Sequence, residues 1–152
     1  SNLNHTQSSR SIDSLSLNGK PIGEIAQWTL YHGAVGMPLI LLTGETAACA
    51  EAEALVPGIT TVAVKQGLSR ESAVSVSKEK ARALIRAGAI RAVEQHRARP
   101  VEPLLWEGPY VLVKRYFHTH EADRYDGMAN AERLDGQTVR ITGDDIRQVL
   151  YA

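Results

Sequence analysis

The sequence predicts an α/β protein with a parallel-sheet core and flanking helices, followed by a small α+β C-terminal part. Residues 21–65 read as helix, strand, helix, strand, which is the order of a parallel sheet with crossover helices. Pro38–Leu42 and Ile59–Lys65 are apolar runs of strand length between turn residues, as in buried parallel strands. The 152 residues, of which 43% are hydrophobic and 22% charged, can bury a core.

The first elements follow from changes in the spacing of the apolar residues. Residues 1–11 are polar and predict a loop, whereas Ile12–Leu17 alternates as a short strand that ends at the turn residues Asn18 and Gly19. Pro21 to Val35 has apolar residues at helical spacing, with proline in the first turn. Glu45 to Leu55 is rich in Ala and Glu and predicts a second helix, with Glu45 near its positive N-terminus.

The remaining elements lie on both sides of a proline-containing segment. They are a strand at 73–76, a helix from the N-cap Ser77 to about Arg99, a strand at 110–117, a helix at 120–128, a strand at 138–141 and a last helix capped by Thr142 or Asp144. The expected division is therefore an α/β core at 1–99, a linker at 100–109 and a small α+β subdomain at 110–152.

Composition and charge exclude several classes of protein. The 17 basic and 17 acidic residues give zero net charge, so we expect no nucleic-acid partner. No apolar run approaches the roughly 18 residues of a membrane span, so we expect no membrane partner. The only cysteine, Cys49, excludes an internal disulfide and a Cys-type zinc site, and it indicates a reducing, cytoplasmic location. Cys49 lies in an alanine-rich predicted helix, where we expect it to be a small buried residue of the core.

Two polar residues near the N-terminus are candidates for chemistry. His5 stands among hydrogen-bonding side chains with almost nothing apolar beside it, so it is either a functional imidazole or a solvated loop histidine. Glu24 opens a predicted helix, where a carboxylate either ligates a cation or compensates the helix dipole.

Further candidates are weaker. His118, His120, Glu121 and Asp123 form a cluster that could bind a transition metal or be a solvated edge, with Thr119 or His120 capping a helix. Lys65 and Arg70 flank a glycine turn after a strand, where they either bind an anionic group or belong to a solvated loop. There is no serine triad and no glycine-rich phosphate motif.

Five segments, taken in order, resemble the DppA-type D-aminopeptidase family of metallopeptidases. The segments are LNHTQSSR at 3–10, NG at 18–19 with GEI at 23–25, PLILLTG at 38–44 with AAC at 47–49, VKQGLSR at 64–70 with Ala73, and LDGQTV at 134–139. They are similar to the family's HTxSS, NGxxxGE, VPVVLVTGDxAAC, VKxGxxRxSA and DGRTV stretches, and together they cover nearly the whole chain.

This resemblance implies a di-zinc aminopeptidase that releases N-terminal D-amino acids from short peptides, assembled into ring-like homo-oligomers. By position, His5 matches the nucleophile or general base and Glu24 matches a zinc-binding glutamate. Lys65 and Arg70 fall in a motif where they could bind substrate. The family's other zinc ligands, an Asp-x-Glu pair and two histidines, precede the HTxSS motif, so the resemblance implies that an N-terminal half is missing here.

Two alternatives remain. The chain could be a truncated, non-catalytic relative that oligomerises or binds a partner. An N-terminal nucleophile hydrolase that uses Ser1 is the third hypothesis.

Overall fold

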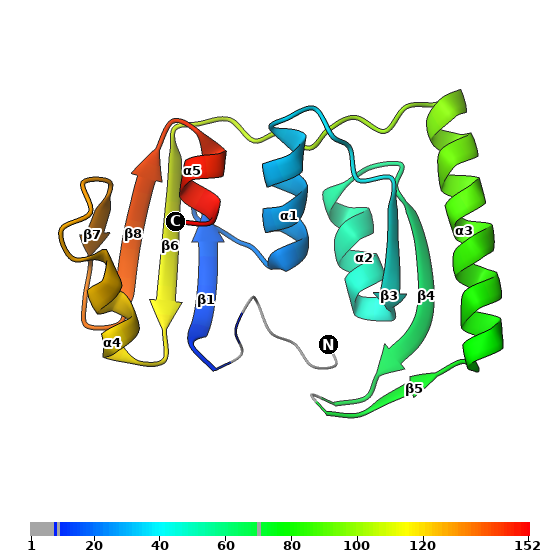
Figure 1. The fold of residues 1–152 in the computed structure, drawn as a ribbon, viewed down its shortest axis with the longest axis horizontal. Helices are drawn as coiled ribbons and strands as arrows, with labels where there is room; N and C mark the ends of the chain where they lie inside the picture. The colour runs from blue at the N-terminus through cyan, green and yellow to red at the C-terminus, as the bar shows by residue number, and fades with distance from the viewer. Residues whose placement is uncertain (1–7, 9, 70) are drawn as a thin grey trace. The chain divides into compact units, whose positions relative to one another are not determined.

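The computed structural model describes residues 8, 10–69 and 71–152, which form two compact units (Figure 1). One unit is Val35–Leu104 and the other joins residues 8–34 to Leu105–Ala152. Ser1, His5, Ser9 and Arg70 lie outside the described residues.

The unit Val35–Leu104 is a small three-layer α/β structure. Its sheet has the order β3 (Leu41–Glu45), β4 (Thr60–Gly67) and β5 (Ala73–Ser75). Strands β3 and β4 are parallel, with Leu41 opposite Thr60, and β4 and β5 form an antiparallel hairpin. The helices are α2 (Thr46–Leu55) and α3 (Lys78–Ala98).

The two helices cover opposite faces of this sheet. Successive side chains of a strand point to opposite sides, and two successive side chains of β4 bond to different helices. The Thr61 hydroxyl donates to Glu53 of α2, whereas the Thr60 hydroxyl, one residue earlier, donates to Gln95 of α3 at 2.7 Å. Ser77 caps α3 as expected, since its Oγ accepts a hydrogen bond from the backbone N–H of Lys80 at 3.3 Å.

The second unit contains an antiparallel sheet with the strand order β2-β1-β6-β8-β7. The strands are β1 (Ile12–Leu17), β2 (Lys20–Pro21), β6 (Tyr110–Tyr116), β7 (Ala131–Arg133) and β8 (Thr138–Gly143). The helices are α1 (Glu24–Gly33), α4 (Thr119–Ala122), the 3-10 turn η1 (Asp123–Tyr125) and α5 (Ile146–Leu150). Its core includes Leu17, Leu30, Leu112, Ile141 and Leu150, which are completely buried.

Asn18 forms the turn after β1 and bonds to the start of β6, which follows the unit Val35–Leu104 in the chain. Its φ is +50°, followed by +76° at Gly19, as expected for a tight turn. The Asn18 side chain accepts a hydrogen bond from the Val111 N–H at 2.8 Å and donates to the Glu107 carbonyl at 3.2 Å. The turn therefore sets the register of β1 against β6.

The parallel-sheet core is only partly observed. Among the strands that the structure describes, only β3 and β4 run parallel, and β1, which we expected in the parallel core, pairs antiparallel with β6. Residues 8–34 consequently join the C-terminal segment, which differs from the expected division at 1–99 and 110–152. The alternation of apolar and polar residues in β1 is compatible with a parallel or an antiparallel neighbour. The strand that lies beside β1 in the fold decides which of the two forms.

Three local predictions also need correction. Leu41 and Leu42, expected to be buried, are half-buried because β3 lies at one edge of the described sheet. Asp145, rather than Thr142 or Asp144, caps the last helix, with its Oδ1 accepting from the Arg147 N–H at 2.9 Å. The expected helix at 120–128 is divided into α4 and η1.

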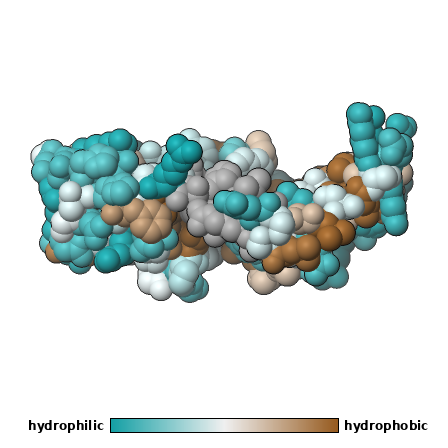
Figure 2. All heavy atoms as spheres, turned by 90° about the horizontal axis from the view of Figure 1, so that it is seen from below, coloured by the Kyte–Doolittle hydropathy of each residue, from teal (hydrophilic) through white to brown (hydrophobic). Residues whose placement is uncertain are grey.

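The surface of the Val35–Leu104 unit is partly apolar. The β4–β5 hairpin exposes Leu68 and Val74, and apolar surface is visible in this part of the molecule in Figure 2. No helix in the described part of the chain is both long enough and apolar enough to cross a membrane.

Candidate functional site

Glu24 lies in the first turn of α1, and its side chain is exposed. The preceding Gly23 has an extended backbone (φ −110°, ψ −171°) and starts the helix without a side-chain cap. The buried side of α1 includes Ala26 and Leu30, which leaves Glu24 on the solvent side of the positive helix end. A carboxylate in this position can serve as an oxygen ligand for a cation.

Glu24 acts electrostatically on Tyr151, which follows α5. Burial raises the pKa of Tyr151, and the negative charge of Glu24 raises it further. The Tyr151 ring also meets the edge of the Tyr31 ring, with 5.2 Å between the ring centroids. The surroundings of Glu24 are therefore partly aromatic.

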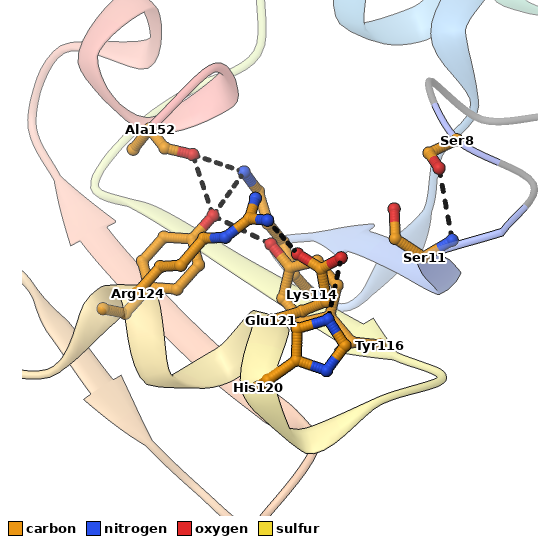
Figure 3. Close-up of polar contacts among 9 residues, drawn as sticks. Ser8, Ser11, Lys114, Tyr116, His120, Glu121, Arg124 and Ala152 are labelled. Atoms are coloured by element: carbon orange, nitrogen blue, oxygen red, sulfur yellow. Dashed lines mark hydrogen bonds and ion pairs between the residues drawn. The ribbon is translucent and has the colours of Figure 1, made fainter.

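The polar N-terminal motif that contains His5 leads directly into β1. His5 itself lies outside the described residues, but Ser8 at the end of the motif is described. The Ser8 Oγ accepts from the Ser11 N–H at 3.2 Å (Figure 3), and the Ser8 carbonyl accepts from the Ile12 N–H at 3.0 Å. Ser8 thus forms a turn at the start of the strand.

Lys65 lies near the carboxyl end of β4, beside the carboxyl end of the parallel strand β3. Its register partner is Glu45, the last residue of β3 and the N-cap of α2. Glu45 is only 6% exposed, whereas Lys65 is half-buried. The carboxyl ends of parallel strands are where α/β proteins bind ligands. Arg70 lies outside the described residues, and Lys65 and Glu24 belong to different units.

The histidine cluster at the end of β6 is a solvated edge. The His118 and His120 rings stack with 5.6 Å between their centroids, and both residues are exposed. Glu121 pairs with Arg124 at 2.9 Å and lies 3.7 Å from His120 (Figure 3). The described residues contain no group of three or more His, Cys, Asp or Glu side chains that could hold a metal ion.

The zinc site implied by the resemblance is therefore not complete in the described residues. Glu24 supplies one carboxylate, and Zn²⁺ in proteins takes three or four protein ligands. Burial and then the charge of Glu53 raise the pKa of the Cys49 thiol, which disfavours the thiolate that a metal ligand requires. As expected, Cys49 is buried in the core.

A buried polar cluster in the unit of residues 8–34 and Leu105–Ala152 was not predicted from the sequence. The Lys114 ammonium, only 5% exposed, donates to the Tyr125 hydroxyl at 3.2 Å and to the Ala152 carbonyl (Figure 3). The Tyr125 hydroxyl lies 2.8 Å from the Tyr116 hydroxyl and donates to the same Ala152 carbonyl at 3.1 Å. These bonds connect β6, η1 and Ala152, two residues after the end of α5.

The alternation of buried and more exposed residues along β6 could have indicated this cluster. Leu112, Lys114 and Tyr116 are all buried, so a lysine occupies a position with the apolar period of the strand. Burial and the hydrogen bond with Tyr125 raise the pKa of Tyr116 well above its usual value. Tyr116 is therefore neutral near pH 7, and the cluster joins elements that are distant in the sequence.

The comparisons with known proteins agree with one another. The family model described as D-aminopeptidase matches residues 1–152. A D-aminopeptidase of Bacillus subtilis (strain 168) is 33% identical over 88 residues, covering 57% of this chain and 32% of that protein. The structure of the Zn-dependent D-aminopeptidase DppA from Bacillus subtilis, described as a self-compartmentalizing protease, matches with a TM-score of 0.87 and 25% identity.

The structural match covers 98% of this chain and 54% of the DppA chain, so the chain spans about half the length of that relative. Its mixed arrangement of helices and sheets is thus that of one part of DppA. Because the family match extends over all 152 residues, this chain belongs to the D-aminopeptidase family.

Proposed function

We propose that the protein carrying this chain is a metal-dependent aminopeptidase that releases N-terminal D-amino acids from short peptides or amides. We further propose that it works as a cytoplasmic homo-oligomer with zinc as the metal. The observation that carries this proposal is the D-aminopeptidase family match over residues 1–152. The similarity to the Zn-dependent, self-compartmentalizing DppA supports it.

In this proposal, His5 accepts a proton or attacks the substrate, and Glu24 is a zinc ligand. The exposed carboxylate of Glu24 at a helix start suits a cation ligand. Lys65 and Arg70 are proposed to bind the anionic end of a peptide. In support, Lys65 is half-buried and lies at the carboxyl ends of two parallel strands, where α/β proteins commonly bind ligands. The described residues do not by themselves form a complete zinc site.

The first prediction concerns catalysis by the full-length protein. With zinc and D-alanyl-p-nitroanilide as substrate, we expect hydrolysis that is much slower for the L-isomer. His5→Ala lowers kcat/KM by about 10²- to 10⁴-fold, the usual contribution of a general base. Glu24→Gln lowers both the zinc content, measured by elemental analysis, and the activity, because a carboxylate ligand becomes a neutral amide.

Glu107→Gln is the matched control for Glu24, because it makes the same chemical change at an exposed glutamate of the same unit. We expect it to retain activity. Full activity in both His5→Ala and Glu24→Gln would overturn the assignment of these residues.

A non-catalytic relative is the second candidate, since the described residues contain no group able to hold a metal. On this hypothesis the chain contributes to oligomerisation or partner binding. Substoichiometric zinc in the full-length protein, together with no hydrolysis of D-alanyl substrates, would favour it.

A further inference from the structure

Helix α3 is long, but it uses only one narrow side to contact its own unit. Of its 21 residues, only Gly88 and Ala92 are buried. On the opposite side, Ile90 is 52% exposed and Val93 is 42% exposed. An amphipathic helix normally buries one apolar side, so exposed apolar residues on a second side are available for another contact.

The second apolar side has the spacing of a helix that pairs with another helix. We call it the outer stripe, and its residues alternate in steps of four and three: Glu79, Ala83, Arg86, Ile90, Val93 and Arg97. This is the 3.5-residue average period of helices packed side by side. All six residues are exposed.

The outer stripe is complementary to itself when a second copy runs antiparallel and the two copies cross near the level of Gly88. Ala83 then faces Val93 of the other copy, and the methylene stem of Arg86 lies against Ile90. At the ends, Glu79 faces Arg97. Each contact occurs twice because the arrangement has a two-fold axis.

Charge at the ends selects the antiparallel direction. In a parallel pair, Glu79 would face Glu79 and Arg97 would face Arg97, whereas the antiparallel pair joins opposite charges. Lys80 and Glu94, on one flank of the outer stripe, also face each other across an antiparallel pair. The hydrophilic N-terminal end of α3 is visible at the right of Figure 2.

We propose that the outer stripe of α3 binds the outer stripe of a second copy of this chain, antiparallel, as a two-fold interface. The inference rests on the proposed function only through the homo-oligomer. It is independent of the site residues, because none of His5, Glu24, Lys65 or Arg70 lies in α3. A loss of oligomer mass with activity on D-alanyl substrates retained would thus separate the two proposals.

The test exchanges the charges at the two ends of the stripe in the full-length protein. Glu79→Arg places two arginines opposite each other at both ends of the pair, and Arg97→Glu places two glutamates there. Since exposed pairs contribute modestly, we expect each single variant to weaken association by about 10- to 100-fold. Breaking a two-fold interface halves the mass of the assembly, which light scattering measures near the dissociation constant.

The double variant Glu79→Arg/Arg97→Glu restores opposite charges across the interface, so we expect it to recover the mass of the unchanged protein. Arg91→Glu is the matched control, because it makes the same charge reversal on the flank of α3. We expect it to leave the mass unchanged. Circular dichroism confirms that each variant is folded.

Cysteine pairing tests the register directly. A mixture of Ala83→Cys and Val93→Cys proteins is expected to form a mixed disulfide dimer on oxidation, faster than either variant forms dimers alone. Buried Cys49 can stay in place. Unchanged mass in both single charge variants, failure of the double variant to recover the mass, or random cross-linking would each overturn the proposal.

Discussion

Lys114 carries an ammonium group into a position that its strand otherwise gives to apolar side chains. It is 5% exposed, and its acceptors come from η1 and from Ala152. A buried charge is tolerated only where hydrogen bonds replace its lost hydration. At the scale of single residues, this lysine is therefore a connection between elements rather than a surface charge.

Truncation of Lys114 tests this role. We expect Lys114→Ala to lower the free energy of unfolding by about 2–4 kcal/mol, because it leaves a cavity and removes the donor to Tyr125 and Ala152. Lys114→Met, which keeps most of the stem volume, is expected to cost less. Urea unfolding measures both, and equal losses in the two variants would show that packing of the stem contributes nothing.

Tyr116 makes the free energy of unfolding depend on pH in the alkaline range. Its pKa is raised by burial and by Tyr125, so the folded protein holds this proton more tightly than the unfolded chain. The corresponding stability is complete below pH 10, the unfolded pKa, and decreases as pH rises above it. We expect the free energy of unfolding to fall with pH in this window.

Tyr116→Phe removes the titrating group and is expected to flatten that decrease. The Tyr125 hydroxyl keeps its contacts with Lys114 and Ala152, so the variant loses only about 0.5–1.5 kcal/mol at pH 7. Denaturation curves at several pH values from 8 to 11 provide the measurement. An unchanged pH slope in Tyr116→Phe would contradict this explanation.

Single residues also show how far the site could be predicted from sequence. The position of Glu24 in the first turn of a helix was predicted and is confirmed, but the helix begins at Glu24 and not at Pro21, which lies in β2. The role of Lys114 was not predicted, because its partners are 11 and 38 residues away and no local pattern identifies them. The metal-binding role of Glu24 remains a proposal, since its co-ligands are not among the described residues.

At the scale of elements, α3 approaches β4 closely because Gly88 has no side chain. A Cβ at this position would lie 2.2 Å from Val62 Cγ2. Real contacts of that length do not occur, so an added methyl group must displace either the helix or the strand. The glycine is required by packing in spite of its low helix propensity.

Gly88→Ala is expected to destabilise the protein by about 1–3 kcal/mol, although alanine is the better helix former. Val62→Ala removes the obstructing methyl groups, so Gly88→Ala should cost less in that background than alone. Thermal unfolding of the four proteins in this cycle measures the coupling. Additive effects would indicate that the two side chains do not compete for space.

Elements with a strong local signal were predicted well. The Ser77 cap, the 21-residue α3 and the parallel pairing of two strands are confirmed, although β3 (Leu41–Glu45) begins three residues after the start of the predicted strand at Pro38–Leu42. The short edge strand Ala131–Arg133 was missed, because three residues carry no period. The pairing of β1 with β6 was also missed, since alternation shows that a strand has two unlike faces but does not identify its neighbour.

At the scale of the whole molecule, the chain order and the spatial order differ. The unit Val35–Leu104 is inserted between two segments that together form the other unit. Composition supports a folded chain, but it contains no information about such an insertion. The structural match covers 54% of the DppA chain, so these two units correspond to about half of DppA.

The insertion has a consequence for biosynthesis. A ribosome makes β1 before the whole of Val35–Leu104, so the partner strand β6 follows almost a hundred residues later. The described strands and helices of the inserted unit all come from one continuous stretch of chain. Until β6 is made, Leu15 and Leu17 of β1 lack the strand beside which they are buried, so β1 can aggregate during that interval.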